Sequence, residues 1–262
     1  MKRPLVIAHR GDSVHAPENT LGAFRMAIDA GAEGVEFDVQ LSSDGVPVVI
    51  HDYDLKRTGS RADKAAAVSA KDLGETDVGS WFNRKFPKFK RAAFADEHVP
   101  TLNQVLALLK NFDGLIYIEL KAEGGDFRQL VAAVCDVIRD SPQLEQMIVK
   151  SFRLGAIPLV RHLLPSVQTA ALFAPEIMTY LRRREHIIAL AREFGAHQIS
   201  VHYTLVTPNL CGLAAAARMP LTVWTVDDPN WIARRKTCEI RALITNDPGK
   251  FLSHLLAWSS PS

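Results

Sequence analysis

The sequence Val6-Ile7-Ala8-His9-Arg10-Gly11 is a short apolar run that ends in charged residues. The same arrangement returns twice: Gly34-Val35 leads into Glu36 and Asp38, and Val48-Val49-Ile50 leads into His51-Asp52. Charged side chains gain nothing from burial at the end of a strand, but there they bring reactive groups to the edge of a sheet. Two imidazoles with a pair of carboxylates suit phosphoryl chemistry, with proton transfer by the imidazoles and one divalent metal ion on the carboxylates.

Apolar runs and helical patterns alternate along the whole chain. Most of the apolar runs are continuous, as expected for a parallel sheet covered on both faces. Eight strands are predicted: Leu5–His9, Val35–Val39, Leu115–Leu120, Met147–Ser151, Thr169–Phe173, Gln198–His202, Leu221–Val226 and Ala242–Thr245. The expected fold is an α/β TIM (β/α)₈ barrel, which commonly takes ~250 residues. An open doubly wound sheet is the alternative, weakened because no G-x-G-x-x-G follows the first strand.

Helical patterns fill the intervals between these strands. Asn19 or Thr20 caps a helix that stops near Gly31, and Thr101–Gln104 forms a capping box at the start of another. Further helices are predicted over Phe127–Arg139, Leu154–Leu163, Glu176–Phe194, Pro208–Arg218, Asn230–Lys236 and Lys250–Trp258.

The run Pro47–His51 breaks the alternation. It follows Val39 too closely for a parallel crossover, which needs roughly a dozen residues. The link carries Asp44-Gly45, a turn signal typical of hairpins. We therefore expect the second strand to turn and return antiparallel, which brings His51 near the acidic pair.

Residues 53–99 are the other irregular region, rich in charged residues, alanine and glycine. Segments of this length inside a compact domain are usually lids or insertions. We interpret the region as a small insertion over the barrel rim, within one domain that spans residues 1–262.

Composition excludes several classes of protein. The 262 residues are 47% apolar and 23% charged, and the net charge of +2 is too small for a nucleic-acid binder. The apolar windows are too short for a secretory signal or for stable membrane insertion. The three cysteines, Cys135, Cys211 and Cys238, are odd in number and far apart, so no disulfide framework is expected. These features predict a cytoplasmic protein in a reducing compartment.

Three acidic residues form the candidate metal set. Glu36 and Asp38 are two positions apart and point to the same side of a strand, where they repel each other unless a cation or protons lie between them. Glu119 repeats the pattern, sharing a face with Tyr117 and Lys121 on another predicted strand. Carboxylate oxygens suit one hard cation, Mg²⁺ or Ca²⁺, better than Zn²⁺. An ion pair with a nearby lysine or arginine is the structural alternative.

The remaining candidate site residues also stand at strand ends. His9 and His51 each precede an Arg or an Asp, which favours a catalytic role over a structural one. Arg10 offers a planar fork for phosphate oxygens, and Lys121 a point charge for the same anion. Trp224 ends another apolar run and is expected to pack on an apolar or polyol part of a substrate, although such residues more often belong to a core.

Together these motifs resemble the glycerophosphodiester phosphodiesterase family, bacterial cytoplasmic type, in the family order and over nearly the whole chain. The matching segments are Ala8-His9-Arg10-Gly11, Pro17-Glu18-Asn19-Thr20, Glu36-Phe37-Asp38-Val39, Asp44-Gly45, Val49-Ile50-His51-Asp52, Arg57-Thr58, Gly79-Ser80-Trp81-Phe82, Pro100-Thr101-Leu102, Ile118-Glu119-Leu120-Lys121, Ser151-Phe152, Trp224-Thr225-Val226 and Ile244-Thr245-Asn246.

The resemblance implies a TIM barrel with an insertion after His51-Asp52. It also implies hydrolysis of a small-molecule glycerophosphodiester to sn-glycerol 3-phosphate and an alcohol. By matching position it implies an acid–base pair, His9 and His51; a metal set, Glu36, Asp38 and Glu119; and two phosphate-binding residues, Arg10 and Lys121.

Several alternatives stay open at this point. A lysophospholipase D-like relative on the same barrel would need an apolar docking surface, for which the aromatic residues of the insertion are the candidates, although a buried insertion core is favoured. A dinuclear metallohydrolase usually begins with H-x-H on its first strand, and a non-catalytic barrel would lack a key residue. The sequence leaves open the identity of the metal, the alcohol, the oligomeric state, which histidine is the acid, and whether water or the glycerol 2-hydroxyl attacks.

Overall fold

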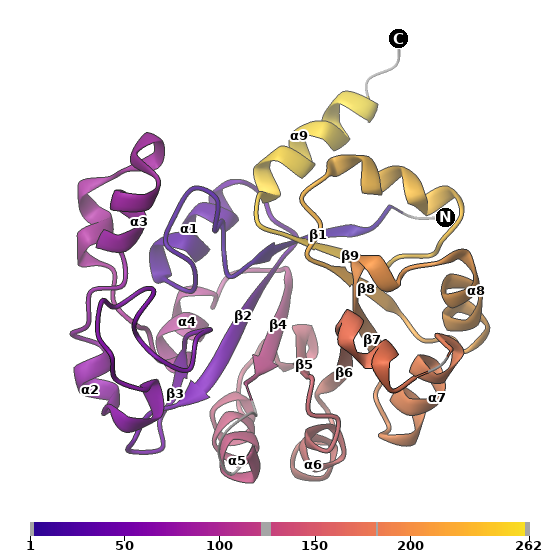
Figure 1. Cartoon of the computed structure of the whole chain (residues 1–262), viewed down its shortest axis with the longest axis horizontal. Coiled ribbons are helices and arrows are strands. Elements are labelled where there is room, and N and C mark those ends of the chain that lie inside the picture. Colours follow the sequence, from indigo (N-terminus) through magenta and orange to yellow (C-terminus); the bar gives the residue numbers. More distant parts are fainter. Residues whose placement is uncertain (1–2, 122–126, 182, 260–262) are drawn as a thin grey trace.

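A closed barrel of eight parallel strands forms the centre of the chain in a computed structural model that describes residues 3–121, 127–181 and 183–259 (Figure 1). β1 (Leu5–His9) pairs in parallel with both β2 (Gly34–Leu41) and β9 (Ala242–Thr245), and this double pairing closes the barrel. The other parallel strands are β4 (Leu115–Leu120), β5 (Met147–Ser151), β6 (Gln168–Phe173), β7 (Gln198–His202) and β8 (Leu221–Trp224). The predicted TIM barrel is confirmed.

Helices between the strands cover the outside of the barrel, as Figure 1 shows. The α-helices of this layer are α1 (Leu21–Asp29), α4 (Leu102–Leu108), α5 (Phe127–Ile138), α6 (Ala156–Leu163), α7 (Glu185–Glu193), α8 (Pro208–Ala216) and α9 (Pro248–Ser259). The predicted caps are present: Thr20 accepts from the Ala23 amide, and Thr101 with Gln104 forms the capping box. Each satisfies amides that a helix start leaves unpaired.

The predicted hairpin is confirmed. β3 (Pro47–Val49) returns antiparallel to β2, with Val49 opposite Val39. Beyond the paired segment, the Ile50 amide donates to the carbonyl oxygen of Asp38 (3.0 Å). This last bond places His51 next to the end of β2, where the acidic pair lies.

The insertion over residues 53–99 has its own small core, seen beside α1 and β3 in Figure 1. It contains α2 (Ala70–Leu73), α3 (Ser80–Lys85) and three short 3₁₀ helices, η1 (Ala65–Ala67), η2 (Pro87–Phe89) and η3 (Ala92–Asp96). Its aromatic rings pack together and against Ala16 and Ala23, with Trp81, Phe82 and Phe94 buried. The expectation that these aromatics form an insertion core is therefore confirmed.

Two predicted helices take another form. The pattern over Glu176–Phe194 yields η5 (Pro175–Thr179) and then α7, not one helix. Tyr180 between them is 82% exposed, so this part lacks the packing that stabilises most protein helices. The pattern over Asn230–Lys236 forms the 3₁₀ helix η7 (Pro229–Lys236), and two further 3₁₀ turns are η4 (Leu144–Gln146) and η6 (Tyr203–Leu205).

The core is divided between the inside and the outside of the barrel. The inside is a small apolar plug that includes Ile7, Tyr117, Ile148 and Ile244. The Tyr117 hydroxyl bonds to Thr222 Oγ1 across the barrel (3.1 Å) and so satisfies its polar end. This plug fills the barrel below the strand ends, so a substrate has access only from the rim.

The expectation of unpaired cysteines is wrong. Cys211 on α8 and Cys238 after η7 form a disulfide across 27 residues, and only Cys135 is free. Sequence separation could not exclude this pair, because the fold brings the segment after η7 next to α8 at this bond. The cysteine argument for a reducing compartment fails with it. Among the described residues, no helix is long and apolar enough to cross a membrane.

Candidate active site

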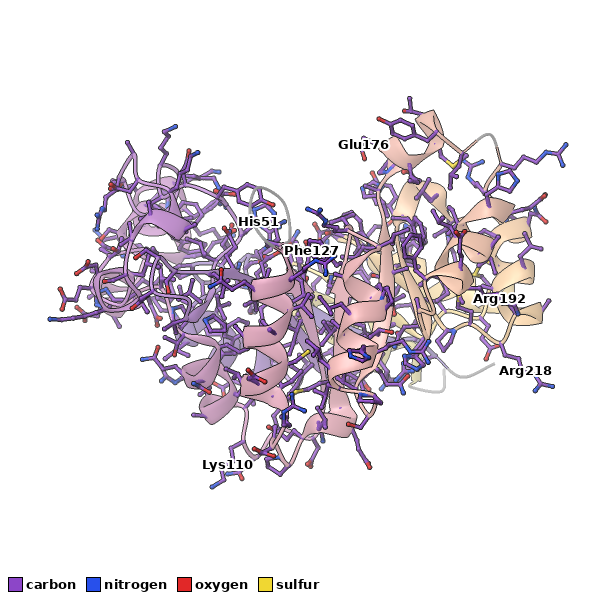
Figure 2. All side chains as sticks on the ribbon, turned by 90° about the horizontal axis from the view of Figure 1, so that it is seen from below. His51, Lys110, Phe127, Glu176, Arg192 and Arg218 are labelled. Carbon is purple, nitrogen blue, oxygen red and sulfur yellow. A yellow bond between two sulfur atoms is a disulfide. The ribbon has the colours of Figure 1, made fainter. Side chains whose placement is uncertain are left out.

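The predicted site residues lie where β1, β2, β4 and β8 end and where the β3 hairpin returns. Figure 2 shows this edge of the molecule uppermost, with His51 and Glu176 on it, and Lys110 and Arg218 at the opposite edge. In parallel barrels the loops at the carboxyl ends of the strands form the active site.

The three acidic residues come together as predicted. Glu36 and Asp38 point inward from β2, and Asp38 stands opposite Glu119 of β4 in the register. All three are buried, with exposures of 0%, 1% and 6%. One oxygen from each lies within 4.8 Å of the other two, which is close enough for a single ion to bind all three.

Ion pairs surround the same cluster, so the structural alternative is also realised. Arg10 Nε lies 3.1 Å from Asp38 Oδ2, and Lys121 Nζ lies 3.2 Å from Glu119 Oε1. Although burial raises it, these charges, with that of His51, hold the pKa of Asp38 far below its usual value. The acid therefore stays ionised, which is the state that a metal ligand needs.

The donor set fits a hard divalent cation. Among the described residues, Glu36 Oε2 is buried and accepts no hydrogen bond, whereas Glu36 Oε1 has the Lys150 ammonium at 2.7 Å. A buried carboxylate oxygen without a partner is costly unless a cation completes it. Mg²⁺ and Ca²⁺ prefer such oxygens, whereas Zn²⁺ sites usually contain histidine or cysteine.

His9 points one ring nitrogen toward this cluster, and a hydrogen bond holds its other ring nitrogen. Its Nε2 lies 3.8 Å from Glu36 Oε2, and its Nδ1 donates to Asn246 Oδ1 (2.7 Å). Asn246 donates in turn to Asp227 Oδ2 (2.8 Å), which orients its amide. Burial, together with the charge of Arg10, lowers the pKa of His9 from 6.5 to about 4. The ring is therefore neutral at pH 7, with its Nε2 lone pair toward the acids.

His51 has a different partner. Its Nδ1 donates to Asp52 Oδ1 (2.7 Å), and Asp52 also accepts from Arg57 Nε. The hydrogen bond from His51 and the charge of Arg57 hold the pKa of Asp52 well below its usual value despite burial. The bond to Asp52 orients the His51 ring and fixes its tautomer.

Ion pairs through Glu18 connect the insertion to the barrel. Glu18 accepts from Arg10 (2.8 Å) and from two nitrogens of Arg57 (both 2.7 Å). Arg10 adopts a left-handed backbone conformation (φ 58°), and Gly11 follows at φ 81°. This turn directs the Arg10 guanidinium back toward Asp38, where Coulomb attraction holds it.

Trp224 lies on the opposite part of the rim. Its ring makes edge contacts with Phe152 (5.5 Å between centroids) and His202 (5.2 Å). The Trp224 indole nitrogen has no hydrogen-bond partner among the described residues. The predicted position at a strand end is confirmed, and its contact with substrate stays a prediction.

Sequence reasoning missed three polar residues of the site. Lys150 lies 2.7 Å from Glu36 Oε1 and 3.4 Å from Glu119 Oε2, Asn19 donates to Asp38 Oδ2 (3.0 Å), and Asn246 orients His9. Lys150 carried a readable signal, because it interrupts the apolar run Met147–Ser151 at the rim end. The two asparagines follow or precede loops, where polar residues are ordinary and carry no signal.

Comparisons with known proteins match this geometry. The glycerophosphoryl diester phosphodiesterase family model matches residues 9–250. A glycerophosphodiester phosphodiesterase of Caldanaerobacter subterraneus subsp. tengcongensis is 30% identical over 94% of this chain and 95% of its own.

Two solved structures share the fold. An Oleispira antarctica phosphodiesterase in complex with the product sn-glycerol-3-phosphate is 25% identical, with a TM-score of 0.83 over 97% of both chains. A glycerophosphodiester phosphodiesterase from Thermotoga maritima is 28% identical, with a TM-score of 0.75 over 97% of this chain and 99% of its own.

Proposed function

Because the chain belongs to the glycerophosphodiester phosphodiesterase family, we propose that it hydrolyses glycerophosphodiesters to sn-glycerol 3-phosphate and an alcohol. The observation that carries the proposal is the buried group of Glu36, Asp38 and Glu119 at the barrel rim, with His9 against it. The product bound to the Oleispira antarctica relative supports the same reaction.

One Mg²⁺ or Ca²⁺ on the three acids would supply positive charge to the phosphodiester and its transition state. Glu36, Asp38 and Glu119 would each offer one carboxylate oxygen to it. Arg10 and Lys121 line the edge of this cluster, where they would hold phosphate oxygens.

The different hydrogen-bond partners of the two histidines suggest which one accepts a proton and which one donates a proton. His9 is neutral and turns Nε2 inward, so it would accept the proton of the attacking oxygen. His51 is oriented by the Asp52 carboxylate through Nδ1, so it would serve as the general acid for the leaving alkoxide. The bond from phosphorus to the attacking oxygen forms, and the bond from phosphorus to the alcohol oxygen breaks. His9 gains the proton of the attacking oxygen, and His51 gives its proton to the leaving alcohol.

No observation favours the lysophospholipid alternative. That activity needs an apolar surface at the rim. Of the four aromatic residues that are candidates for it, Trp81 is 9% exposed and Phe82 0%, while Phe86 and Phe89 are half-buried and pack against the insertion core. Water-soluble glycerophosphodiesters are the substrates that this rim suits.

The activity is tested with glycerophosphocholine, glycerophosphoethanolamine and glycerophosphoinositol, each with and without EDTA, by coupling to glycerol-3-phosphate dehydrogenase. We expect product from at least one substrate with Mg²⁺ or Ca²⁺ present and little with EDTA. Failure on all three substrates with metal present would contradict the proposal.

The metal role is tested by Glu36→Gln across a Mg²⁺ and Ca²⁺ titration. The variant removes one ligand charge, so half-maximal activity is expected at a cation concentration at least tenfold higher. Glu75→Gln, at an exposed position of the insertion, is the matched control and should behave like wild type. A Glu36→Gln titration identical to wild type would reject the metal assignment.

A further inference from the structure

Lys150 is the most buried basic residue of the site. Its side chain is 2% exposed, and it stands opposite Glu119 in the β4–β5 register. The ammonium lies 2.7 Å from Glu36 Oε1 and 3.4 Å from Glu119 Oε2, so it contacts two of the three acids of the candidate metal set. Burial disfavours its charge, but Glu36 and Glu119 outweigh burial and raise the pKa of Lys150.

The other two basic residues lie farther out. Arg10 and Lys121 are 17% and 12% exposed, and both approach Asp38 from the rim. If Arg10 and Lys121 turn toward an anionic substrate, the acids need another positive charge beside them. Lys150 supplies that charge, because its buried side chain stays next to Glu36 and Glu119.

Basic groups already compensate the three acids without any divalent ion. In the described part of the chain, the three carboxylates face Arg10, Lys121 and Lys150, and of these Arg10 is shared with Glu18. A divalent cation on Glu36 and Glu119 must therefore share oxygens with an ammonium that repels it. Buried carboxylates without that ammonium would repel each other strongly in the empty site.

We propose that Lys150 is a built-in counter-cation of the metal site, which holds Glu36 and Glu119 in place without metal and weakens divalent-cation binding. It acts through the two carboxylates and is a positioning residue. The inference rests on the proposed metal role of the three acids. If this is right, the divalent cation binds weakly and exchanges readily, and Glu36 and Glu119 keep their positions when no cation is bound.

The test measures Mn²⁺ binding, with Mn²⁺ as a paramagnetic probe, by equilibrium titration of wild type and Lys150→Met. Methionine keeps the length of the side chain and removes its charge. We expect the variant to bind Mn²⁺ at least tenfold more tightly. Lys150→Arg, which keeps the charge, should bind like wild type, and so should Lys110→Met at the opposite end of the barrel.

Thermal unfolding supplies a second readout. Without divalent cation, Lys150→Met should melt at a lower temperature than wild type, and saturating Mn²⁺ should restore most of the difference. A purely structural lysine would give a loss that Mn²⁺ does not restore. If Lys150→Met folds only with Mn²⁺, the same conclusion holds, whereas failure to fold even with Mn²⁺ overturns the inference.

The outcomes separate this inference from the proposed function. Equal or weaker Mn²⁺ binding by Lys150→Met, beside clear binding by wild type, overturns the role of Lys150 and leaves the metal site intact. Absence of binding by wild type, Lys150→Met and Glu36→Gln alike rejects the metal site, and the inference falls with it.

Discussion

The two halves of the barrel rim carry different chemistry. The half built from β1, β2, β4 and β5 bears charge: His9, Glu36, Asp38, Glu119 and Lys150 all lie there, most of them buried. The half built from β7 and β8 bears rings, where His202 contacts both Tyr203 and Trp224. The charged half suits the reacting phosphate, and the aromatic half suits the uncharged part of a substrate.

The difference follows from what each half can bury. Charged groups inside a protein need partners, and these come from Glu18 between β1 and α1, from Asp52 after the β2–β3 hairpin and from Arg57 of the insertion. In the described residues of the aromatic half, β7 continues through η6 into α8, and β8 is followed by η7, with no counterpart of the insertion over 53–99. There rings keep one edge on the apolar core and the other toward the open rim.

Removing an imidazole from the charged half should have the largest effect. His9→Ala and His51→Ala should each lower kcat by about 10³-fold, because each transfers a proton in the transition state. His202→Ala, in the aromatic half, should lower it less than tenfold. Steady-state kinetics measure these losses, and circular dichroism checks that each variant is folded. Equal losses of kcat at His202 and His51 would contradict the proposed difference between the two halves.

The disulfide belongs to the aromatic half and should affect stability, not activity. Closing a loop of 27 residues is worth about 3 kcal/mol, so Cys211→Ser should lose roughly that much in urea unfolding while keeping wild-type kcat. Dithiothreitol should destabilise wild type by a similar amount. Cys135→Ala, which removes the free thiol of α5 and keeps the disulfide, is the control and should respond to dithiothreitol as wild type does, whereas Cys211→Ser should not respond.

Acid should destabilise the charged half through His9. Its folded pKa of about 4 lies below the unfolded value of 6.5, so the unfolded chain binds a proton first as the pH falls. The stability contribution is present above pH 6.5 and is lost toward pH 4, by about 2 kcal/mol at pH 5. Urea unfolding at pH 7 and pH 5 in EDTA should show a smaller loss for His9→Gln, and an equal loss would refute the assignment.

Trp224→Ala should have the smallest effect. The ring is expected to touch the substrate without taking part in the reaction, so KM should rise about tenfold, or ~1.4 kcal/mol, with kcat nearly unchanged. Tyr180→Ala, at an 82% exposed ring, is the matched control and should leave both parameters unchanged. A fall in kcat with constant KM would place Trp224 with the charged half.

Local pattern was enough for the frame of the molecule. Continuous apolar runs predicted the parallel strands, and Asp44-Gly45 predicted the hairpin that returns His51 to Asp38. Side-chain parity on β2 predicted that Glu36 and Asp38 share a face. The long irregular segment 53–99 predicted the insertion, and the family resemblance added the substrate class and supported the roles of the two histidines.

Contacts between distant segments required the tertiary structure. Asn246 reaches His9 across 237 positions, and Cys211 meets Cys238, although nothing in their spacing marks either pair. The predicted helix over Glu176–Phe194 forms η5 and α7 instead of one helix, because only part of it packs against the rest of the protein.

The sequence by itself determined the barrel and the residue types at its strand ends, because strand periodicity and apolar runs act locally. Only the tertiary structure decided which charges share a buried volume, and so that Lys150 joins Glu36 and Glu119. The physical reason is that Coulomb energy depends on distance in space and on burial, neither of which is fixed by separation along the chain.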